Sequence, residues 1–523
     1  MIPAAAGRKG EPDLNDIAVQ FRHVSMAFPG VLANDDVSLD IRKGEVFALV
    51  GENGAGKSTL MNILYGIHTP TGGSVSIRGE EVSRFSPRNA IEHGVGMVHQ
   101  HFMLTPVMTV AENVVIGSEP VRGVFFDRKK AEAQVAAMID EYNFHISATA
   151  KVETLSVGEQ QRVEILKALY RGADLLILDE PTAVLTPQEV EDLFRVMRQL
   201  KAAGKSIIII THKLKETMEI ADRVSVLRQG KMIESGVPVA GTTMNELAQM
   251  MVGRDVELSV TRRAEQVGEE NFSVRGLSLT ERGVPILRDV CLSLRKGEIL
   301  GIAGIEGNGQ TELIEVLTGL RRPDHMELFK DGKPLSGNAA AFLAAGVGHV
   351  PEDRMTRGLV LEMSIEDNLI LGYHRRPAFA RRGLRLASAI RRFAEQERTE
   401  FAIKAPNVQE RCSALSGGNQ QKVVIARVFS ENPDVIIVAQ PTRGVDVGAM
   451  EYIHHRLLDL RDGGKSILLI SADLDEVRSL SDRLAVIYGG RIVAEGKPDT
   501  WSDMEIGLLM TGGSLAPEKE GTA

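Results

Sequence analysis

Short, almost wholly apolar runs recur along the chain between polar loops and helical stretches. FALV at 47–50, LLIL at 175–178 and IIII at 207–210 are typical of strands that are buried on both faces of a parallel sheet. STLMNILYG at 58–66 instead predicts the start of a helix, directly after a glycine-rich loop. Together with short β-rich segments before them and a helical middle, these runs predict an α/β fold with an inserted helical part.

The same order of segments occurs twice. Residues 37–66 return at 290–319, displaced by 253 positions, and LSVGEQQRVEILKAL from Leu155 returns as LSGGNQQKVVIARVF from Leu415, displaced by 260. The repeat predicts two domains, and a polar stretch with neither strand alternation nor a helical apolar stripe separates them. We place a first domain at 1–253, a linker at 254–271, a second domain at 272–515 and a C-terminal tail at 516–523.

Composition narrows the class of protein. The chain is 43% hydrophobic and 25% charged, and it has no apolar run near the roughly 18 residues that a membrane helix needs. The first residues lack the apolar core of a secretory signal, and Cys291 and Cys412 are too few for a disulfide framework. We therefore expect a cytoplasmic protein whose two cysteines are inert core residues.

Charge argues against a nucleic-acid partner. The formal net charge is -9, whereas affinity for a phosphate backbone comes mainly from clustered Lys and Arg. One exception is the stretch from Arg375 to Arg392, which holds seven arginines. Such a cluster can meet anionic lipid or RNA, although a solvated helical face is its commoner role.

The clearest chemical motif is GENGAGKS at 51–58, which fits the phosphate-loop pattern G-x4-G-K-[ST]. Its glycines let backbone N–H groups surround an anion at a helix N-terminus, Lys57 adds a positive charge, and the Ser58 hydroxyl reaches Mg2+. We expect ATP contacts from nine consecutive residues: Gly51, Glu52, Asn53, Gly54, Ala55, Gly56, Lys57, Ser58 and Thr59.

Two carboxylates end the apolar run LLILDE. We expect Asp179 to bind Mg2+ through its water shell and Glu180 to polarise the attacking water, although the pair can also cap the next helix. His212 follows the run SIIIIT, where its imidazole can contact the γ-phosphate. A histidine at a strand end is, taken alone, more often structural.

These motifs resemble the ABC ATPase family, whose signature LSGGQ stands here as LSVGEQ at Leu155 and LSGGNQ at Leu415. The resemblance covers nearly the whole chain. It implies two tandem P-loop ATPase domains, each with an α/β core, an antiparallel β part and an inserted helical subdomain. It also implies that Gln100 senses Mg2+ and the membrane partner, and that Phe28 stacks on adenine.

In this family two domains pack head to tail, so that each ATP lies between one phosphate loop and the other domain's signature. The resemblance therefore implies that the second signature completes the first ATP site, through Ser416, Gly417, Gly418 and Gln420. Its implied catalytic residues are Lys57, Gln100, Glu180 and His212, and its implied Mg2+ residues are Ser58, Gln100 and Asp179.

The second site departs from the family pattern. Its loop GIEGNGQT keeps Gly304, Gly309 and Thr311 but has Gln310 in place of the lysine. Glu352 stands for the loop glutamine, Ala439 and Gln440 stand for the two carboxylates, and Ala472 stands for the histidine; Ser156 and Gly158 belong to the signature that would face this site. We expect this site to bind nucleotide weakly and hardly hydrolyse it.

The resemblance is strongest to importer ATPases for simple sugars and nucleosides. It implies a motor at the cytoplasmic face of the cell membrane, bound under two permease subunits and served indirectly by an extracytoplasmic solute-binding protein, with no nucleic-acid partner. The stretches VHQHFML and AQPTRGVDVGAM are similar to the nucleoside branch. Two alternatives stay open: a ribose- or galactose-type sugar importer, and a ribosome-associated tandem ABC ATPase, which should carry two intact sites.

Overall fold

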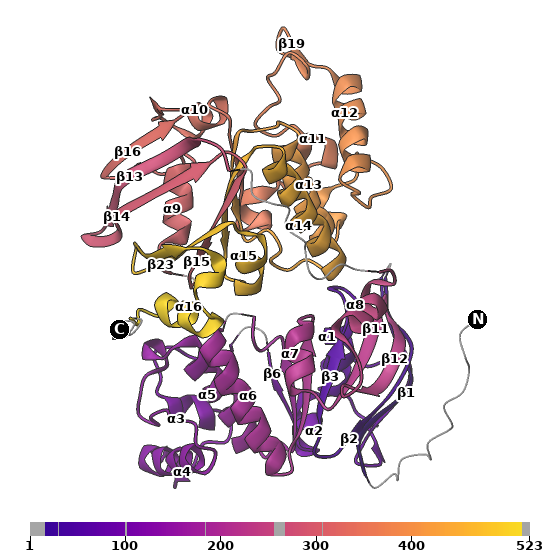
Figure 1. Cartoon of the computed structure of the whole chain (residues 1–523). Helices are drawn as coiled ribbons and strands as arrows, with labels where there is room; N and C mark the ends of the chain where they lie inside the picture. The colour runs from indigo at the N-terminus through magenta and orange to yellow at the C-terminus, as the bar shows by residue number, and fades with distance from the viewer. Residues whose placement is uncertain are drawn as a thin grey trace. The chain divides into compact units, whose positions relative to one another are not determined.

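The computed structural model describes residues 16–29, 31–99, 102–183, 185–255, 267–305 and 307–514. The chain divides into two compact units, Met1–Val256 (unit 1) and Glu257–Ala523 (unit 2), each with one copy of the repeat (Figure 1). Strand β13 begins at Glu270, inside the expected linker, because Phe272 is already part of the core of unit 2. Residues 256–266 and the expected tail lie outside the described residues.

Unit 1 is built on a six-stranded sheet in the order β12-β11-β3-β10-β9-β6. All its pairings are parallel except that of β12 with β11, which is antiparallel. Every residue of β3 and β10 is buried, as their continuous apolar sequences predict. The strands span Val46–Val50 (β3), Val95–Val98 (β6), Leu175–Asp179 (β9), Ser206–Thr211 (β10), Arg223–Arg228 (β11) and Lys231–Pro238 (β12).

An antiparallel sheet, β2-β1-β4-β5, packs against this core. Phe21 and Leu39 from the antiparallel sheet share one apolar cluster with Phe47 of β3 and Leu60 of the first helix. The strands span Ile17–Phe28 (β1), Val31–Arg42 (β2), Gly72–Ile77 (β4) and Glu80–Glu81 (β5). The helices span Lys57–Leu64 (α1), Pro87–Glu92 (α2), Val110–Val115 (α3), Arg128–Glu141 (α4), Val152–Thr154 (η2), Val157–Tyr170 (α5), Pro187–Ala202 (α6), Leu214–Ile220 (α7) and Met244–Val252 (α8).

Unit 2 repeats both sheets in the same order, as β18-β21-β22-β15-β23-β24 and β14-β13-β16-β17. Its strands span Glu270–Glu281 (β13), Val284–Arg295 (β14), Glu298–Ala303 (β15), His325–Lys330 (β16), Lys333–Pro334 (β17), Val347–Val350 (β18), Val435–Ala439 (β21), Ser466–Ser471 (β22), Arg483–Tyr488 (β23) and Arg491–Gly496 (β24). Its helices span Gln310–Leu317 (α9), Ala339–Ala344 (α10), Arg354–Gly358 (η3), Ile365–Leu369 (α11), Ala387–Glu400 (α12), Cys412–Ala414 (η4), Gly417–Phe429 (α13), Val447–Asp462 (α14), Leu474–Leu480 (α15), Pro498–Thr500 (η5) and Asp503–Met510 (α16).

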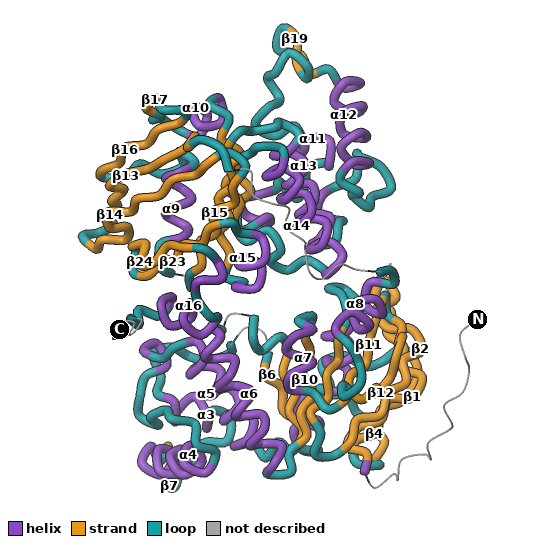
Figure 2. The backbone as a smooth tube through the Cα atoms, in the orientation of Figure 1, coloured by secondary structure: helices purple, strands orange, loops and turns teal. Residues whose placement is uncertain are grey.

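Each unit also has a helical part, which Figure 2 shows as a group of helices beside the strands. It contains α3, α4 and α5 in unit 1 and α11, α12 and α13 in unit 2. Each helical part carries a small hairpin, formed by Val121–Arg122 (β7) with Phe125–Phe126 (β8) and by Ala380–Arg381 (β19) with Leu384–Arg385 (β20). The structure thus confirms the predicted class: two α/β units, each with an antiparallel β part and inserted helices.

Two expectations about single features have different outcomes. Among the described residues, no helix is both long enough and apolar enough to cross a membrane. Cys412 is buried, but Cys291 is exposed, so the prediction of two core cysteines is wrong for Cys291. It lies on the outward-facing side of β14, where its neighbours Val290 and Leu292 point into the core.

Candidate nucleotide-binding site

The glycine-rich loop joins β3 to α1 at the carboxyl end of the parallel sheet. A Cβ on Gly51 would lie 2.1 Å from the carbonyl oxygen of Leu227, and a Cβ on Gly56 would lie 2.2 Å from that of Ala33. Gly56 also has a φ of 99°, which other residues rarely adopt. Side chains are therefore excluded at these two points of the loop, and its backbone can approach an anion at the N-terminus of α1.

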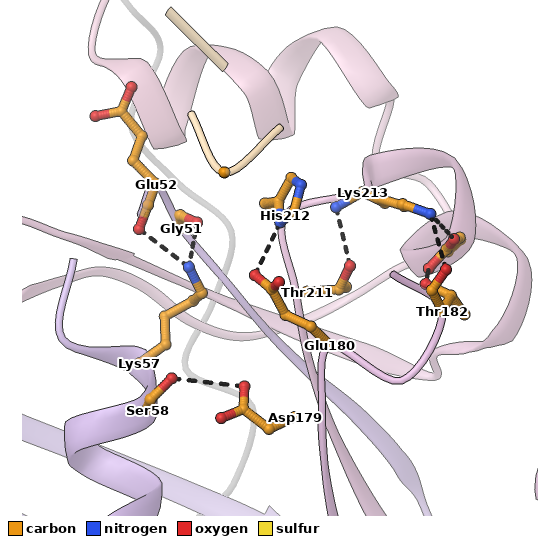
Figure 3. Close-up of polar contacts among 12 residues, drawn as sticks. Gly51, Glu52, Lys57, Ser58, Asp179, Glu180, Thr182, Thr211, His212 and Lys213 are labelled. Atoms are coloured by element: carbon orange, nitrogen blue, oxygen red, sulfur yellow. Dashed lines mark hydrogen bonds and ion pairs between the residues drawn. The ribbon is translucent and has the colours of Figure 1, made fainter. Parts of the chain in front are cut away.

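Lys57, the first residue of α1, folds its side chain back over this loop. Its Nζ donates to the carbonyl oxygens of Gly51, at 2.6 Å, and Glu52, at 3.0 Å (Figure 3). Burial lowers the pKa of Lys57, while the carboxylates of Glu180 and Asp179 act to raise it. An ammonium group that donates to neutral carbonyls forms stronger bonds when phosphate oxygens replace them. The position of Lys57 therefore fits a bound phosphate.

Asp179, the last residue of β9, lies beside the start of α1. Ser58 Oγ donates to Asp179 Oδ1 at 3.5 Å, and burial raises the pKa of Asp179 despite this bond (Figure 3). A buried carboxylate with a raised pKa is stabilised by a nearby cation. Among the described residues, no group of three or more His, Cys, Asp or Glu could hold a metal by itself. These two oxygens instead suit Mg2+, which takes its other ligands from phosphate and water.

Glu180 follows β9 in a left-handed backbone conformation, with a φ of 46°. Its Oε1 lies 3.0 Å from Nδ1 of His212, the residue that follows β10 (Figure 3). Burial raises the pKa of Glu180, but the hydrogen bond and charge of His212 and the charge of Lys57 outweigh it, so the pKa is lowered. Glu180 is thus kept ionised and can accept a hydrogen bond from water. The alternative capping role is wrong, because Thr186 caps α6.

A lysine that the sequence analysis missed links the segments of Glu180 and His212. Lys213 Nζ donates to the carbonyl oxygen of Thr182 at 3.2 Å (Figure 3) and pairs with Glu216 at 3.1 Å. Thr182 Oγ1 also donates to Glu216, at 2.5 Å. The only signal for this contact in the sequence is that Lys213 directly follows His212 at a strand end. Lys213 therefore fixes the segment after Glu180 against the start of α7.

Two residues lie near the phosphate loop of unit 1: Phe28, which the sequence predicts as an adenine contact, and Asn34, which the sequence analysis did not identify. Phe28 ends β1, is 37% exposed, and meets the edge of His68 at 5.4 Å between ring centroids. Asn34 is fully buried, and its Nδ2 donates to the carbonyl oxygen of Gly56 at 3.2 Å. Asn34 thus supports the loop from β2. Gln100 lies outside the described residues.

The phosphate loop of unit 2 keeps the shape of its counterpart without the charge. Gln310 Nε2 donates to the carbonyl oxygen of Ile305 at 2.8 Å, much as Lys57 donates within the loop of unit 1. Gly309 has a φ of 100°, and a Cβ on Gly304 would lie 2.5 Å from Gln310 Nε2. The neutral amide thus fills the position of the ammonium group.

Two other replaced side chains of unit 2, those of Glu352 and Gln440, form hydrogen bonds within the unit. Thr311 Oγ1 lies 3.2 Å from both carboxylate oxygens of Glu352. Gln440 has the same φ of 46° as Glu180, but its Oε1 accepts from the N–H of Ala472 at 3.2 Å. Ala439 ends β21 where a carboxylate ends β9. The side chains that stand for water- and metal-binding groups are therefore engaged in hydrogen bonds within the unit.

The two signature helices begin differently. Ser156 caps α5 in a reciprocal capping box with Glu159, and the N–H of Gly158 donates to Glu189 at 3.0 Å. Ser416, at the start of α13, makes no side-chain bond to the helix backbone, and its Oγ accepts from Asn419 at 2.8 Å. The side chain of Ser416 therefore does not cap the N-terminus of α13.

Two glycines and a glutamine follow Ser416. A Cβ on Gly417 would lie 2.6 Å from Arg354 Nη2, and a Cβ on Gly418 would lie 2.9 Å from Asp446. Gln420 is only 7% exposed, and its Nε2 donates to the carbonyl oxygen of Cys412 at 3.0 Å. This side chain holds the segment before the helix, and the expected contact of Gln420 with ATP stays a prediction.

Comparisons with known proteins find relatives that match nearly the whole chain. A guanosine import ATP-binding protein of Bacillus subtilis is 47% identical over 95% of this chain and 98% of its own length. A nucleoside import ATP-binding protein of Lactococcus lactis is 45% identical over 96% and 99%, and a glucose import ATP-binding protein of Haloferax volcanii is 43% identical over 96% and 97%.

An archaeal ribosome recycling factor aligns with a TM-score of 0.61 over 93% of this chain and 91% of its own, at 19% identity, which shows a shared fold alone. The family model "ABC transporter" matches residues 34–183 in unit 1 and 287–443 in unit 2. With whole-length relatives above 40% identity and one family match in each unit, the chain belongs to the ABC transporter family of ATP-binding proteins.

Proposed function

We propose that this chain is the ATP-hydrolysing subunit of an ABC importer that takes up nucleosides. The observation that carries the ATPase part is the meeting of Lys57, Ser58 and Asp179 with the Glu180–His212 pair at the carboxyl edge of one sheet. The nucleoside part rests on the two relatives in Bacillus and Lactococcus that are named for guanosine and nucleoside import. Together they support a motor that couples hydrolysis to uptake.

Each side chain of this site has a distinct role in the proposal. Bound MgATP supplies the phosphoanhydride bond that water cleaves. Lys57 exchanges its carbonyl partners for phosphate oxygens and offsets their charge. Ser58 and Asp179 provide oxygen donors for Mg2+, and Glu180, held by His212, orients water and accepts its hydrogen bond. Phe28 offers a half-exposed ring for adenine.

The family resemblance adds three elements to the proposal. The start of α13, with Ser416, Gly417 and Gly418, completes the ATP site of unit 1 in the working transporter, and Gln100 senses Mg2+. Unit 2 supplies this signature but does not hydrolyse ATP itself, since Gln310 and Gln440 lack the charges that Lys57 and Glu180 provide. The matching signature of unit 1 begins at Ser156 and Gly158.

The proposed assembly places the chain at the cytoplasmic face of the cell membrane. Two permease subunits form the path for the solute, and a separate extracytoplasmic protein selects it. ATP binding and hydrolysis then drive the permease between its two states. The solute never enters the ATPase, so its identity is set by those partners.

Simple-sugar import is the second candidate, because relatives named for glucose and ribose import are 43% and 40% identical to this chain. A ribosome-associated role is the third, and the site of unit 2 argues against it. A ribosomal ATPase of this kind should carry two intact sites, whereas Gln310, Ala439 and Ala472 have replaced the lysine, the aspartate and the histidine of unit 2.

The test is uptake of labelled nucleosides, pentoses and hexoses by cells that carry the intact chain, no chain, Glu180→Gln or the matched Gln440→Ala. We expect nucleoside uptake to be lost with the deletion and with Glu180→Gln and retained with Gln440→Ala. Loss of sugar uptake, with nucleoside uptake unchanged, would show that the importer takes up sugars rather than nucleosides. Unchanged uptake of all solutes in the deletion would contradict the importer function.

A further inference from the structure

The hairpin of unit 2 is a firmly anchored projection. Strands β19 and β20 extend beyond α12, away from the sheets of the unit (Figure 1). Below the hairpin, Phe379 and Ile390 are buried in one apolar cluster with Tyr373. Arg385, at its end, pairs with Asp367 of α11. A hairpin fixed in this way presents the residues of its tip without a large loss of conformational entropy on binding.

The arginines of this region divide into two groups. Three of the seven between 375 and 392 form ion pairs with carboxylates of unit 2, namely Glu431, Asp367 and Glu366. These three ion pairs hold the hairpin region against the rest of unit 2, and four arginines remain. The other four are exposed and make no ion pair with any part of the chain that the structure describes: Arg375, Arg381, Arg382 and Arg392. We call these four the free arginines.

Apolar side chains stand beside the cations at the tips of both hairpins. Leu384, next to the turn formed by Arg382 and Gly383, is 74% exposed. In the hairpin of unit 1, Val124 is 89% exposed and Phe125 is 76% exposed. Exposed lysines follow that hairpin too, at the start of α4. Large exposed apolar groups flanked by cations are typical of segments that lie at a membrane surface.

We propose that each of the two hairpins, β7–β8 in unit 1 and β19–β20 in unit 2, binds by itself to the surface of an anionic phospholipid membrane. The free arginines attract the phosphate groups of the lipids, and Leu384, Val124 and Phe125 enter the headgroup layer. This contact goes beyond the proposed function, in which the chain reaches the membrane through its permease. It would add a direct attachment that depends on lipid charge and on salt.

Lipid fits these observations better than RNA. The aromatic side chains near the free arginines, Tyr373 and Phe379, are both only 7% exposed, so they offer no stacking platform for bases. The exposed side chains at the tips are aliphatic or phenyl groups, which suit an apolar layer.

The first test is flotation of the purified full chain, without permease, on vesicles of phosphatidylcholine alone or with phosphatidylglycerol. We expect binding to the anionic vesicles only, and weaker binding at high salt. Neutralising the free arginines (R375Q, R381Q, R382Q and R392Q together) should weaken this binding at least tenfold. A charge-matched control changes four other exposed cations of unit 2, R282Q, R322Q, K333Q and R491Q, and should bind like the original chain.

Basal ATP hydrolysis reports whether these variants are folded, because none of the changed residues belongs to the nucleotide site. Equal loss of binding in the two variants would contradict the proposal, since net charge alone would then explain it. RNA that displaces the chain from vesicles at matched phosphate concentration would also overturn it.

The second test asks whether the tips enter the lipid. The chain has one tryptophan, Trp501, which lies in unit 2 away from both hairpins in sequence. Phe125→Trp and Leu384→Trp each add a reporter at a tip. We expect the emission of these two variants to shift to the blue when anionic vesicles are added, and that of the original chain to stay constant. Absence of the shift in both would overturn the proposal, whatever the outcome of the uptake experiment.

Discussion

At the scale of single residues, the two copies of the phosphate loop form a natural pair. Lys57 and Gln310 both donate to a backbone carbonyl of their own loop, at 2.6 Å and 2.8 Å. The loop therefore tolerates a glutamine at this position without losing its internal bond. What differs is the charge, and charge is what a triphosphate requires.

Lys57→Gln should therefore fold normally and bind MgATP about 10-fold to 100-fold more weakly, since a hydrogen bond to a charged group contributes about 1.5–3 kcal/mol. Titration of the purified chain with ATP measures this loss, and its melting curve without nucleotide checks the fold. Unchanged affinity would mean that the lysine does not contact the phosphates.

A substitution at Lys213 can distinguish an effect on the positioning of the catalytic segment from an effect on ATP binding. Lys213→Met removes the bond to the Thr182 carbonyl and leaves Glu216 with one partner fewer. We expect kcat for ATP hydrolysis to fall about tenfold, in the range of lost orientation effects, while KM changes less than twofold. Lys213→Arg should restore most of kcat, whereas a purely structural role would lower stability in both variants and leave kcat alone.

The residue scale also shows what a sequence can and cannot predict. GENGAGKS and LLILDE were found because their residues are adjacent in the chain, and the fold places their ends together. The contacts of Asn34 and Lys213 join common residue types from distant segments, so no local pattern marks them. The bond of Gln420 to the carbonyl oxygen of Cys412 is likewise absent from any local pattern of the sequence.

At the scale of elements, helix α12 contains a buried glutamate, Glu397. Glu397 is 4% exposed, and its Oε2 has no hydrogen-bond partner among the described residues. Burial, with Glu400 adding to it, raises the pKa of Glu397 to about 7. A carboxyl group whose pKa is higher in the folded chain favours folding when protonated. Stability is therefore lost as the pH rises from the unfolded value through 7.

Glu397→Gln should accordingly stabilise unit 2 at pH 8, by up to about 3 kcal/mol for a shift of this size. The gain should fade as the pH falls to 5, where the original side chain is mostly protonated in the folded chain. Melting temperatures across this range measure the effect. Glu327→Gln, an exposed change on β16, is the control and should alter stability little at any pH. A gain of equal size at pH 5 and pH 8 would contradict the assignment.

At the scale of the whole molecule, two units of one topology differ in chemistry. Their sheets have the same strand order, yet among the described residues only those of unit 1 bring an ammonium group, two carboxylates and an imidazole to the sheet edge. The repeat predicted this symmetry of fold, and the replaced residues predicted the asymmetry of the sites. From the sequence, the seven arginines between 375 and 392 are expected mainly to form a solvated helical face, because the charge pattern of one sequence does not reveal which cations are paired.

Glu180→Gln should lower ATP hydrolysis by the assembled transporter at least 100-fold, because we expect unit 2, which has Gln310 and Gln440 in place of Lys57 and Glu180, not to take over the reaction. Gln440→Ala, at the matching position, should leave hydrolysis within about threefold of the original, since that side chain accepts hydrogen bonds only from its neighbours Ser471 and Ala472 in the described part of unit 2. Phosphate release measures both. Substantial residual turnover in Glu180→Gln would show that unit 2 is itself a catalyst.

Gln440 has the same left-handed backbone as Glu180, although an amide there cannot act as the carboxylate that we propose for Glu180. That conformation is unfavourable for a residue with a side chain, by roughly 1–2 kcal/mol. The backbone conformation at this position is therefore kept in unit 2 without the carboxylate that accompanies it in unit 1. Unit 2 therefore has the fold of unit 1 without its charged site residues. Each of these residues can be introduced singly into unit 2, and the effect on nucleotide binding then measures what that residue contributes.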